Sequence, residues 1–153
     1  ILYRACPTGS LTDTDNSSDA NSVNKTPFPD VESGAFYTKA MNWAYANGIL
    51  TGVDGKGEMQ PNREITREEL ACVMMRYAKS CGIAGADADP SEEGITDWAD
   101  VSSFAMSSIK WALANGVISG VDNLDGTRSL CPHDSASRAQ MAKIILNVEA
   151  MRG

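Results

Sequence analysis

Several features that would narrow the function are absent from this sequence or scarce in it. No apolar run approaches the ~18 residues of a membrane-spanning helix. Histidine occurs once, at His133, and aromatic residues make up only 7% of the chain. Basic residues are outnumbered, with 13 Lys and Arg against 20 Asp and Glu and a formal net charge of −7. This balance argues against a nucleic-acid backbone as the main partner, because phosphate binding favours a basic surface.

The four cysteines form no CxxC pair and show no metal-ligand spacing. They are Cys6, Cys72, Cys81 and Cys131, and the sequence does not choose among their three full pairings. On one continuous helix Cys72 and Cys81 would lie about 13 Å apart, which is too far for a disulfide. We expect most of the cysteines to be buried or free thiols, so they leave the compartment open.

The length and composition are those of an ordinary globular protein. A chain of 153 residues allows one domain or two small ones, and 42% hydrophobic with 22% charged residues permits a sizeable core. The chain begins at Ile1 rather than Met and shows no signal peptide, so we expect it to be a piece of a longer protein.

An internal repeat organises the chain. Four blocks recur in the same order, at spacings that drift from 70 to 68 to 71 residues. Because the order is kept while the spacing drifts, the differences fall in loops. The matched pairs are residues 28–31 with 98–101, 43–54 with 111–122, Pro61 with Pro132, and 65–70 with 136–141.

The repeat predicts the domain organisation. Residues 1–6 resemble the end of a repeat's second helix and are assigned to the tail of a preceding repeat. Residues 7–26 and 82–94 are rich in small and polar residues and are predicted to be linkers. The two whole repeats then occupy residues 27–81 and 95–153.

Each repeat is predicted to contain two helices, so the fold class is all-α. The first helix of the first repeat runs from about residue 37 to residue 47 and ends at Gly48, since glycine takes the left-handed conformation readily. The second helix starts at residue 66. Helix pairs that each bury one apolar stripe must stack, so the repeats should share one core. The expected core residues are Phe36, Ala40, Met41, Trp43 and Ala44 with Phe104, Ser108, Ile109, Trp111 and Ala112, then Leu70, Val73, Met74 and Tyr77 with Met141, Ile144, Ile145 and Val148.

The start of each second helix carries a capping box. Thr66 with Glu69, and Ser137 with Gln140, have the Ser/Thr-x-x-Glu/Gln spacing in which two side chains satisfy orphan backbone N–H groups. We expect these four residues to be structural.

An arginine follows the capping residue in both repeats and does not serve the helix start. Arg67 and Arg138 lie in the first turn, where the helix dipole disfavours a cation by roughly 0.3–1 kcal/mol. Two arginines at one repeat position predict an anion site. The alternative is a structural salt bridge, for example to Asp30 or Asp100.

The ordered blocks resemble the S-layer homology (SLH) module. The pattern is aromatic-x-Asp-Val, Trp-Ala-x-x-Asn-Gly, Asp-Gly, Pro and Thr/Ser-Arg-x-Glu/Gln, and it covers residues 27–80 and 97–150. The resemblance implies helical repeats, usually in threes, that form a three-pronged spindle around a central helix bundle. It also implies non-covalent attachment of a bacterial surface protein to the cell wall. With only two whole repeats the spindle is incomplete, unless a further SLH repeat of the same or another chain supplies the third.

The resemblance also names a ligand and the residues that bind it. The ligand is a secondary cell-wall polysaccharide, often with a pyruvate ketal, bound in grooves between prongs. An arginine fork matches its carboxylate, and the adjacent helix N-terminus would add N–H donors. The second motif departs from the family pattern, being Ser-Arg-Ala-Gln. The implied ligand-binding residues are Arg67, Arg138, Asp30, Asp100, Gly52 and Gly120, with Trp98 as an anchor or groove wall.

Other candidate sites favour structural roles. Trp43 and Trp111 could stack on sugars but lie on apolar helix faces, which favours the core. Asp54, Asp122, Asn123 and Asp125 could hold calcium, but their spacing does not fit an EF-hand loop, which favours a polar turn. His133 lacks a nucleophile and an orienting acid in recognisable arrangement. We expect no catalytic residue, metal or cofactor.

Taken together, these features predict a non-catalytic module that anchors a secreted bacterial protein. It would be extracellular, at the cell wall or surface layer, and would bind an acidic wall polysaccharide without nucleic-acid binding or membrane insertion. Many weak contacts along a repeating polymer would give retention by avidity. The alternative is a protein–protein interaction module of a surface or scaffold protein.

Overall fold

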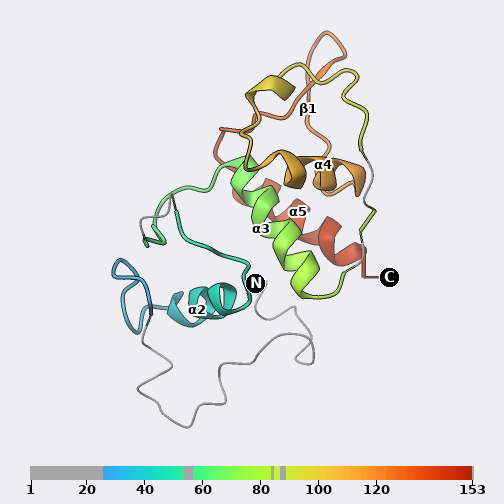
Figure 1. Cartoon of the computed structure of the whole chain (residues 1–153). Coiled ribbons are helices and arrows are strands. Elements are labelled where there is room, and N and C mark those ends of the chain that lie inside the picture. Colours follow the sequence, from blue (N-terminus) through green and yellow to red (C-terminus); the bar gives the residue numbers. More distant parts are fainter. Residues whose placement is uncertain (1–25, 54–56, 84, 87–88, 153) are drawn as a thin grey trace. The chain divides into compact units, whose positions relative to one another are not determined.

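A computed structural model describes residues 26–53, 57–83, 85–86 and 89–152 (Figure 1). This part of the chain is mostly helical, as the all-α prediction requires. None of its helices is long and apolar enough to cross a membrane. The predicted tail at 1–6 and nearly all of the 7–26 linker lie outside the described residues. The elements are α2 (Thr38–Ala46), α3 (Arg67–Ser80), the 3-10 helix η2 (Trp98–Asp100), α4 (Met106–Ala114), β1 (Val121–Asp122), β2 (Arg128–Ser129) and α5 (Arg138–Ala150).

The chain divides into two compact units that do not coincide with the predicted repeats. The first contains the described residues up to 63 together with 80–82, and the second contains 64–79 and the described residues from 83 onward. Helix α2 belongs to the first unit, whereas α4, α5 and all of α3 but its last residue belong to the second. The second helix of the first repeat therefore packs in one unit with both helices of the second repeat.

A small apolar cluster holds α2 in the first unit. Helix α2 ends where the Asn47 side-chain amide donates to the Trp43 carbonyl at 2.8 Å, and Gly48 then takes a φ of 66°. This is the predicted glycine stop. The cluster consists of the buried Phe28, Val31 and Met59 with the half-buried Tyr37, Met41 and Leu50.

Two aromatic residues predicted to lie in the core are exposed instead. Phe36 is 98% exposed and Phe104 is 62% exposed. Both precede their helices, which begin at Thr38 and Met106, so the helical periodicity used to place them does not apply there. Ala40, inside α2, is also exposed.

Helices α3, α4 and α5 supply the core of the second unit. The Tyr77 hydroxyl of α3 donates to Glu149 Oε1 of α5 at 2.8 Å and accepts from Arg152 Nη2 at 2.9 Å, so α3 and α5 lie side by side (Figure 1). Burial, followed by the bond to Glu149, raises the pKa of Tyr77 to about 12. Most of the predicted stripe is buried, namely Leu70, Met74, Tyr77, Ile109, Trp111, Ala112, Ile144 and Val148, while Val73, Met141 and Ile145 are half-buried.

The predicted linker at 82–94 is partly tied down. The Ala86 backbone N–H donates to Asn115 Oδ1 at 2.7 Å, and Lys110 Nζ pairs with Asp89 Oδ1 at 2.6 Å. Both partners lie on or directly after α4. Residues 86 and 89 of this segment therefore lie against α4 or its end.

The backbone just before α3 pairs with the backbone just before α5. Thr66 and Ser135 form an isolated antiparallel bridge. This pairing uses first-turn N–H groups of α3 that a helix start would otherwise leave without acceptors. The bonds are Ala136 N–H to the Ile65 carbonyl at 3.0 Å, Arg67 N–H to the Asp134 carbonyl at 2.9 Å, and Glu68 N–H to the Pro132 carbonyl at 3.1 Å.

Candidate functional site

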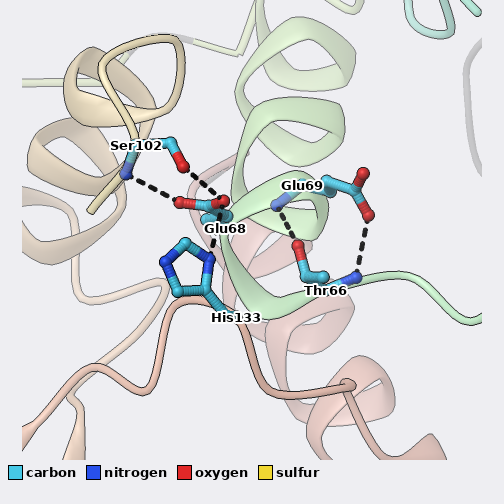
Figure 2. A network of polar contacts seen from close by, with 5 residues as sticks. All are labelled: Thr66, Glu68, Glu69, Ser102 and His133. Carbon is cyan, nitrogen blue, oxygen red and sulfur yellow. Dashed lines mark hydrogen bonds and ion pairs between the residues drawn. The ribbon is translucent and has the colours of Figure 1, made fainter. Parts of the chain in front are cut away.

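Both motif turns form the capping box that the sequence predicts. In the first, the Thr66 N–H donates to Glu69 Oε2 at 2.9 Å, and the Glu69 N–H donates to Thr66 Oγ1 at 3.3 Å (Figure 2). In the second, the Ser137 N–H donates to Gln140 Oε1 at 2.9 Å, and the Gln140 N–H donates to Ser137 Oγ at 3.2 Å. Glutamine thus replaces glutamate in the cap without loss of a bond.

Arg67 is held by the backbone of the segment that leads to α5. Its Nε donates to the Leu130 carbonyl at 2.7 Å, and the residue is half-buried. The positive charge also acts on the neighbouring Cys131 thiol, whose pKa it lowers, although burial outweighs this and raises that pKa overall. The structure gives the two terminal amino groups of Arg67 no hydrogen-bond partner among the described residues.

Arg138 has no comparable support. It is exposed, and its side chain forms no hydrogen bond with any residue in the described ranges. Neither arginine forms an ion pair with a residue that the structure describes. Within the described part of the second unit, the salt-bridge alternative is therefore not observed for Asp100, and for Asp30, which lies in the first unit, it stays a prediction.

The backbone N–H groups of the two turns also differ. In α3 the N–H groups of Arg67 and Glu68 donate to carbonyls of the 132–134 segment, and the capping box uses those of Thr66 and Glu69. The expected help of a helix N-terminus to an anion is therefore absent at Arg67, because its donors are occupied. Of the groups that the sequence predicted for the anion at Arg67, the guanidinium remains.

Glu68 is a buried charged residue that the sequence motif treats as a free position. It is 3% exposed, and its carboxylate accepts the Ser102 N–H at 3.0 Å and the Ser102 hydroxyl at 2.9 Å. His133 Nδ1 lies 3.3 Å from Glu68 Oε1 (Figure 2). His133 thus has the Glu68 carboxylate as its neighbour. The same motif position holds Ala139 in the second repeat. This difference between the repeats is the signal in the sequence that could have singled out Glu68.

In each repeat an aspartate accepts hydrogen bonds from two backbone N–H groups ahead of the second helix. In the second repeat this aspartate is not the predicted residue. Asp30 accepts the N–H groups of Met59, at 3.0 Å, and Gln60, at 2.6 Å. The bond from Met59 is the main reason that the pKa of Asp30 lies below its ordinary value. In the second repeat, however, the equivalent bonds are made by Asp97 rather than Asp100. Asp97 accepts from the N–H groups of Leu130 and Cys131, both at 2.7 Å.

Asp100 lies at the end of η2 and is exposed. Its side chain has no hydrogen-bond partner among the described residues. Pairing Asp30 with Asp100 is therefore wrong as a structural equivalence. The Asp-Val match misled because the second repeat has two acids three residues apart, at Asp97 and Asp100, and only Asp100 is followed by Val.

The two predicted glycines have a backbone role in both repeats. Gly52 has a φ of 84°, and a Cβ there would stand 3.0 Å from the Glu58 carbonyl oxygen. Gly120 has a φ of 81°, and its Cβ would stand 3.2 Å from the Ser129 carbonyl oxygen. Only glycine meets both demands without strain. A ligand contact by these glycines stays a prediction.

The tryptophans separate as expected. Trp43 and Trp111 are buried, which confirms the core assignment for both. Trp98 is half-buried in η2. Its role as an anchor or a groove wall stays a prediction.

The acidic loop of the second repeat is a polar turn that joins β1 and β2. Asp125 Oδ1 accepts both the N–H of Thr127, at 2.9 Å, and its hydroxyl, at 2.6 Å, and the hydroxyl bond is the main reason that the Asp125 pKa is lowered. Within the described ranges no cluster of three His, Cys, Asp or Glu is placed to hold a metal. Asp54 lies outside those ranges.

The cysteines behave in two ways. Cys72 is a buried free thiol and Cys131 a half-buried free thiol. Burial, with the negative charges of Asp134 and Asp97 next, raises the pKa of Cys131. Cys81 is disulfide-bonded, and Cys6 lies outside the described residues.

The family model of the S-layer homology domain matches residues 27–71 and 94–142, which is more than half of the chain. The chain belongs to the S-layer homology family. The two matched segments start 67 residues apart, as do Asp30 and Asp97, and this supports Asp97 as the structural counterpart of Asp30. The domain is a non-catalytic module that anchors proteins to the cell wall, and the chain is an extracellular cell-surface module, as predicted.

Several SLH relatives are large proteins. The chain is 34% identical over 123 residues to an exoglucanase, XynX, of Acetivibrio thermocellus, covering 77% of this chain and 10% of that protein. It is 35% identical over 124 residues to an amylopullulanase of Thermoanaerobacterium thermosulfurigenes, covering 77% and 6%. It is 33% identical over 127 residues to a surface-layer 125 kDa protein of Lysinibacillus sphaericus, covering 80% and 10%. The chain thus spans a tenth or less of these relatives. No solved structure matches it.

Proposed function

We propose that this SLH chain is a non-catalytic anchor that binds an acidic secondary cell-wall polysaccharide, with Arg67 as its principal carboxylate contact. The observation that carries the proposal is the state of Arg67. Its Nε is fixed on the Leu130 carbonyl, while both terminal amino groups lack a described partner. A guanidinium held in this way presents two parallel donors, which suit the two oxygens of a carboxylate.

The charge of the molecule supports a local cation as the recognition element. With a net charge of −7, the chain as a whole repels an acidic polymer at long range. Binding such a polymer therefore requires short-range contacts that outweigh this repulsion. A pyruvate ketal offers a suitable carboxylate on each repeating unit, and several such contacts along one chain would add by avidity.

Arg138 is the second proposed contact, and its site is open. In the first turn, residues 132–134 cover the backbone N–H groups beside Arg67. No described segment covers the corresponding groups beside Arg138. We propose that a further SLH repeat, of the same or another chain, pairs with this turn as 132–136 pairs with 65–68. The spindle with pseudo-threefold symmetry is part of this proposal.

The other predicted contacts divide by accessibility. Asp100 is exposed with no described partner, and Trp98 is half-buried, so both remain proposed ligand contacts. Asp30, Gly52 and Gly120 shape the backbone through the contacts described above. We propose that these three act on the ligand indirectly.

Sedimentation with purified cell walls tests the proposal. The chain should co-sediment with intact walls and lose this binding when the secondary polymer is extracted. Free pyruvylated polymer should compete, and the same polymer with its ketal removed by mild acid should compete less well. Binding that survives extraction would contradict the proposal and indicate a peptidoglycan or protein partner. Release of wall sugars by the chain would contradict its non-catalytic character.

A further inference from the structure

The first motif turn has a buried carboxylate that its helix start does not require. Glu68 follows Arg67 directly and is 3% exposed. The second repeat builds the same capping box with Ala139 in its place. Burial of an ionised carboxylate is unfavourable unless hydrogen bonds compensate. The capping box therefore gives no reason for an acid at this position.

The partners of Glu68 come from two segments that α3 must hold. Ser102, which donates both its N–H and its hydroxyl, lies shortly before α4. His133, with Nδ1 at 3.3 Å, lies in the segment before α5 (Figure 2). The Glu68 backbone N–H also donates to the Pro132 carbonyl at 3.1 Å. One residue therefore ties α3 to both neighbouring segments.

The segment that Glu68 holds is the one that holds Arg67. Leu130 accepts from the Arg67 side chain, Pro132 and Asp134 accept from the α3 backbone, and His133 between them contacts the Glu68 carboxylate. Where alanine replaces the acid, at Ala139, the neighbouring Arg138 is exposed and has no described partner. The arginine that is held by a hydrogen bond is thus the one that a buried acid follows.

We propose that Glu68 is a positioning residue for the Arg67 site. By holding His133 it fixes the 130–134 segment against α3, while Ser102 completes the hydrogen bonding of the buried carboxylate. The Leu130 carbonyl then fixes the guanidinium. This inference rests on the proposed function, since it concerns how well Arg67 is prepared for its ligand. A guanidinium that is ordered before binding loses less side-chain freedom on binding, so affinity rises without any contact between Glu68 and the ligand.

A double-mutant cycle tests the inference with the whole chain and purified walls. Glu68→Ala should weaken wall binding about five- to tenfold, within the range expected for coupled neighbours. In the Arg67→Ala background the same change should alter binding less than about twofold, because Glu68 acts through Arg67. Glu93→Ala removes the same charge at an exposed position and should leave binding unchanged.

The outcomes separate this inference from the proposed function. An equal loss from Glu68→Ala in both backgrounds, or no loss at all, would overturn the positioning role. If Arg67→Ala alone left wall binding intact, the proposed function itself would fail. His133→Ala keeps the inference testable if Glu68→Ala does not fold, since the side chain of His133 is 62% exposed. It should weaken binding about two- to threefold, and again only when Arg67 is present.

Discussion

The two motif turns of this SLH chain are alike in sequence and different in surroundings. Each begins a helix with a complete capping box, and each places an arginine directly after the capping residue. Arg67 is fixed by the Leu130 carbonyl, whereas Arg138 is exposed without a described partner. A local motif therefore determines the helix start, but the packing of other segments determines whether its arginine is ready to bind.

The largest expected effect separates the two arginines. Arg67→Ala should lower wall affinity roughly 30-fold or more, since a charged hydrogen-bonded contact is worth about 2–3 kcal/mol. Arg138→Ala should lower it by no more than about fivefold, as for an exposed charge. The double variant should not sediment with walls. Titration of wall binding measures all three.

Controls keep this comparison interpretable. Arg128→Ala removes an arginine that bonds a backbone carbonyl, of Ser119, outside both turns, and it should leave binding unchanged. Arg67→Ala should also cost about 1 kcal/mol of stability through its lost hydrogen bond, a fall of about 2–4 °C in melting temperature. Equal binding losses for Arg67→Ala and Arg138→Ala would show that the hydrogen bond between Arg67 and the Leu130 carbonyl does not affect wall binding.

The next largest expected difference lies between Asp97 and Asp100, in how much each contributes to the free energy of unfolding. Asp97→Ala leaves the N–H groups of Leu130 and Cys131 without their charged acceptor and should cost about 2–3 kcal/mol in the free energy of unfolding. Asp100→Ala should change it by less than about 0.5 kcal/mol. Urea denaturation of both variants provides the measurement. A greater loss from Asp100→Ala would restore the equivalence suggested by sequence.

Alkaline pH tests a repeat position at which α3 carries a titratable side chain and α5 does not. Tyr77 in α3 occupies the position of Val148 in α5, and burial raises the Tyr77 pKa from 10.0 to about 12. Because the folded-state pKa is raised, its stabilising contribution is complete below pH 10 and is lost as the pH rises toward 12. Thermal melts across this range should show a fall that Tyr77→Phe removes. A fall of the same size in that variant would assign the effect to other groups.

The smallest expected effect is one that the two turns share. Thr66→Ala and Ser137→Ala each remove a capping hydroxyl and should each cost about 1 kcal/mol in unfolding free energy. Chemical denaturation of the two single variants tests this equality. A much greater cost at Thr66 would mean that its pairing with Ser135, and not the cap alone, depends on the hydroxyl.

Local patterns in the sequence predicted the helices well and their surroundings less well. The helix stop at Gly48, the capping boxes and the buried Trp43 and Trp111 follow from short-range rules, and all of these are confirmed. The sequence missed Glu68, because its role depends on Ser102 and His133, which lie 34 and 65 residues away in the chain. It also misplaced Phe36, whose exposure depends on where α2 begins.

The sequence by itself determined the repeat, the helix starts and the family, because capping, periodicity and block order are properties of neighbouring residues. Only the tertiary structure decided which acid of the second repeat accepts the backbone N–H groups and which arginine is hydrogen-bonded. Those choices depend on backbone donors and carbonyls, which every residue type carries and which a sequence therefore does not distinguish. Asp97 and Arg67 are set apart from Asp100 and Arg138 by their hydrogen bonds to the segment at 130–134, which lies more than 30 residues from either of them in the sequence.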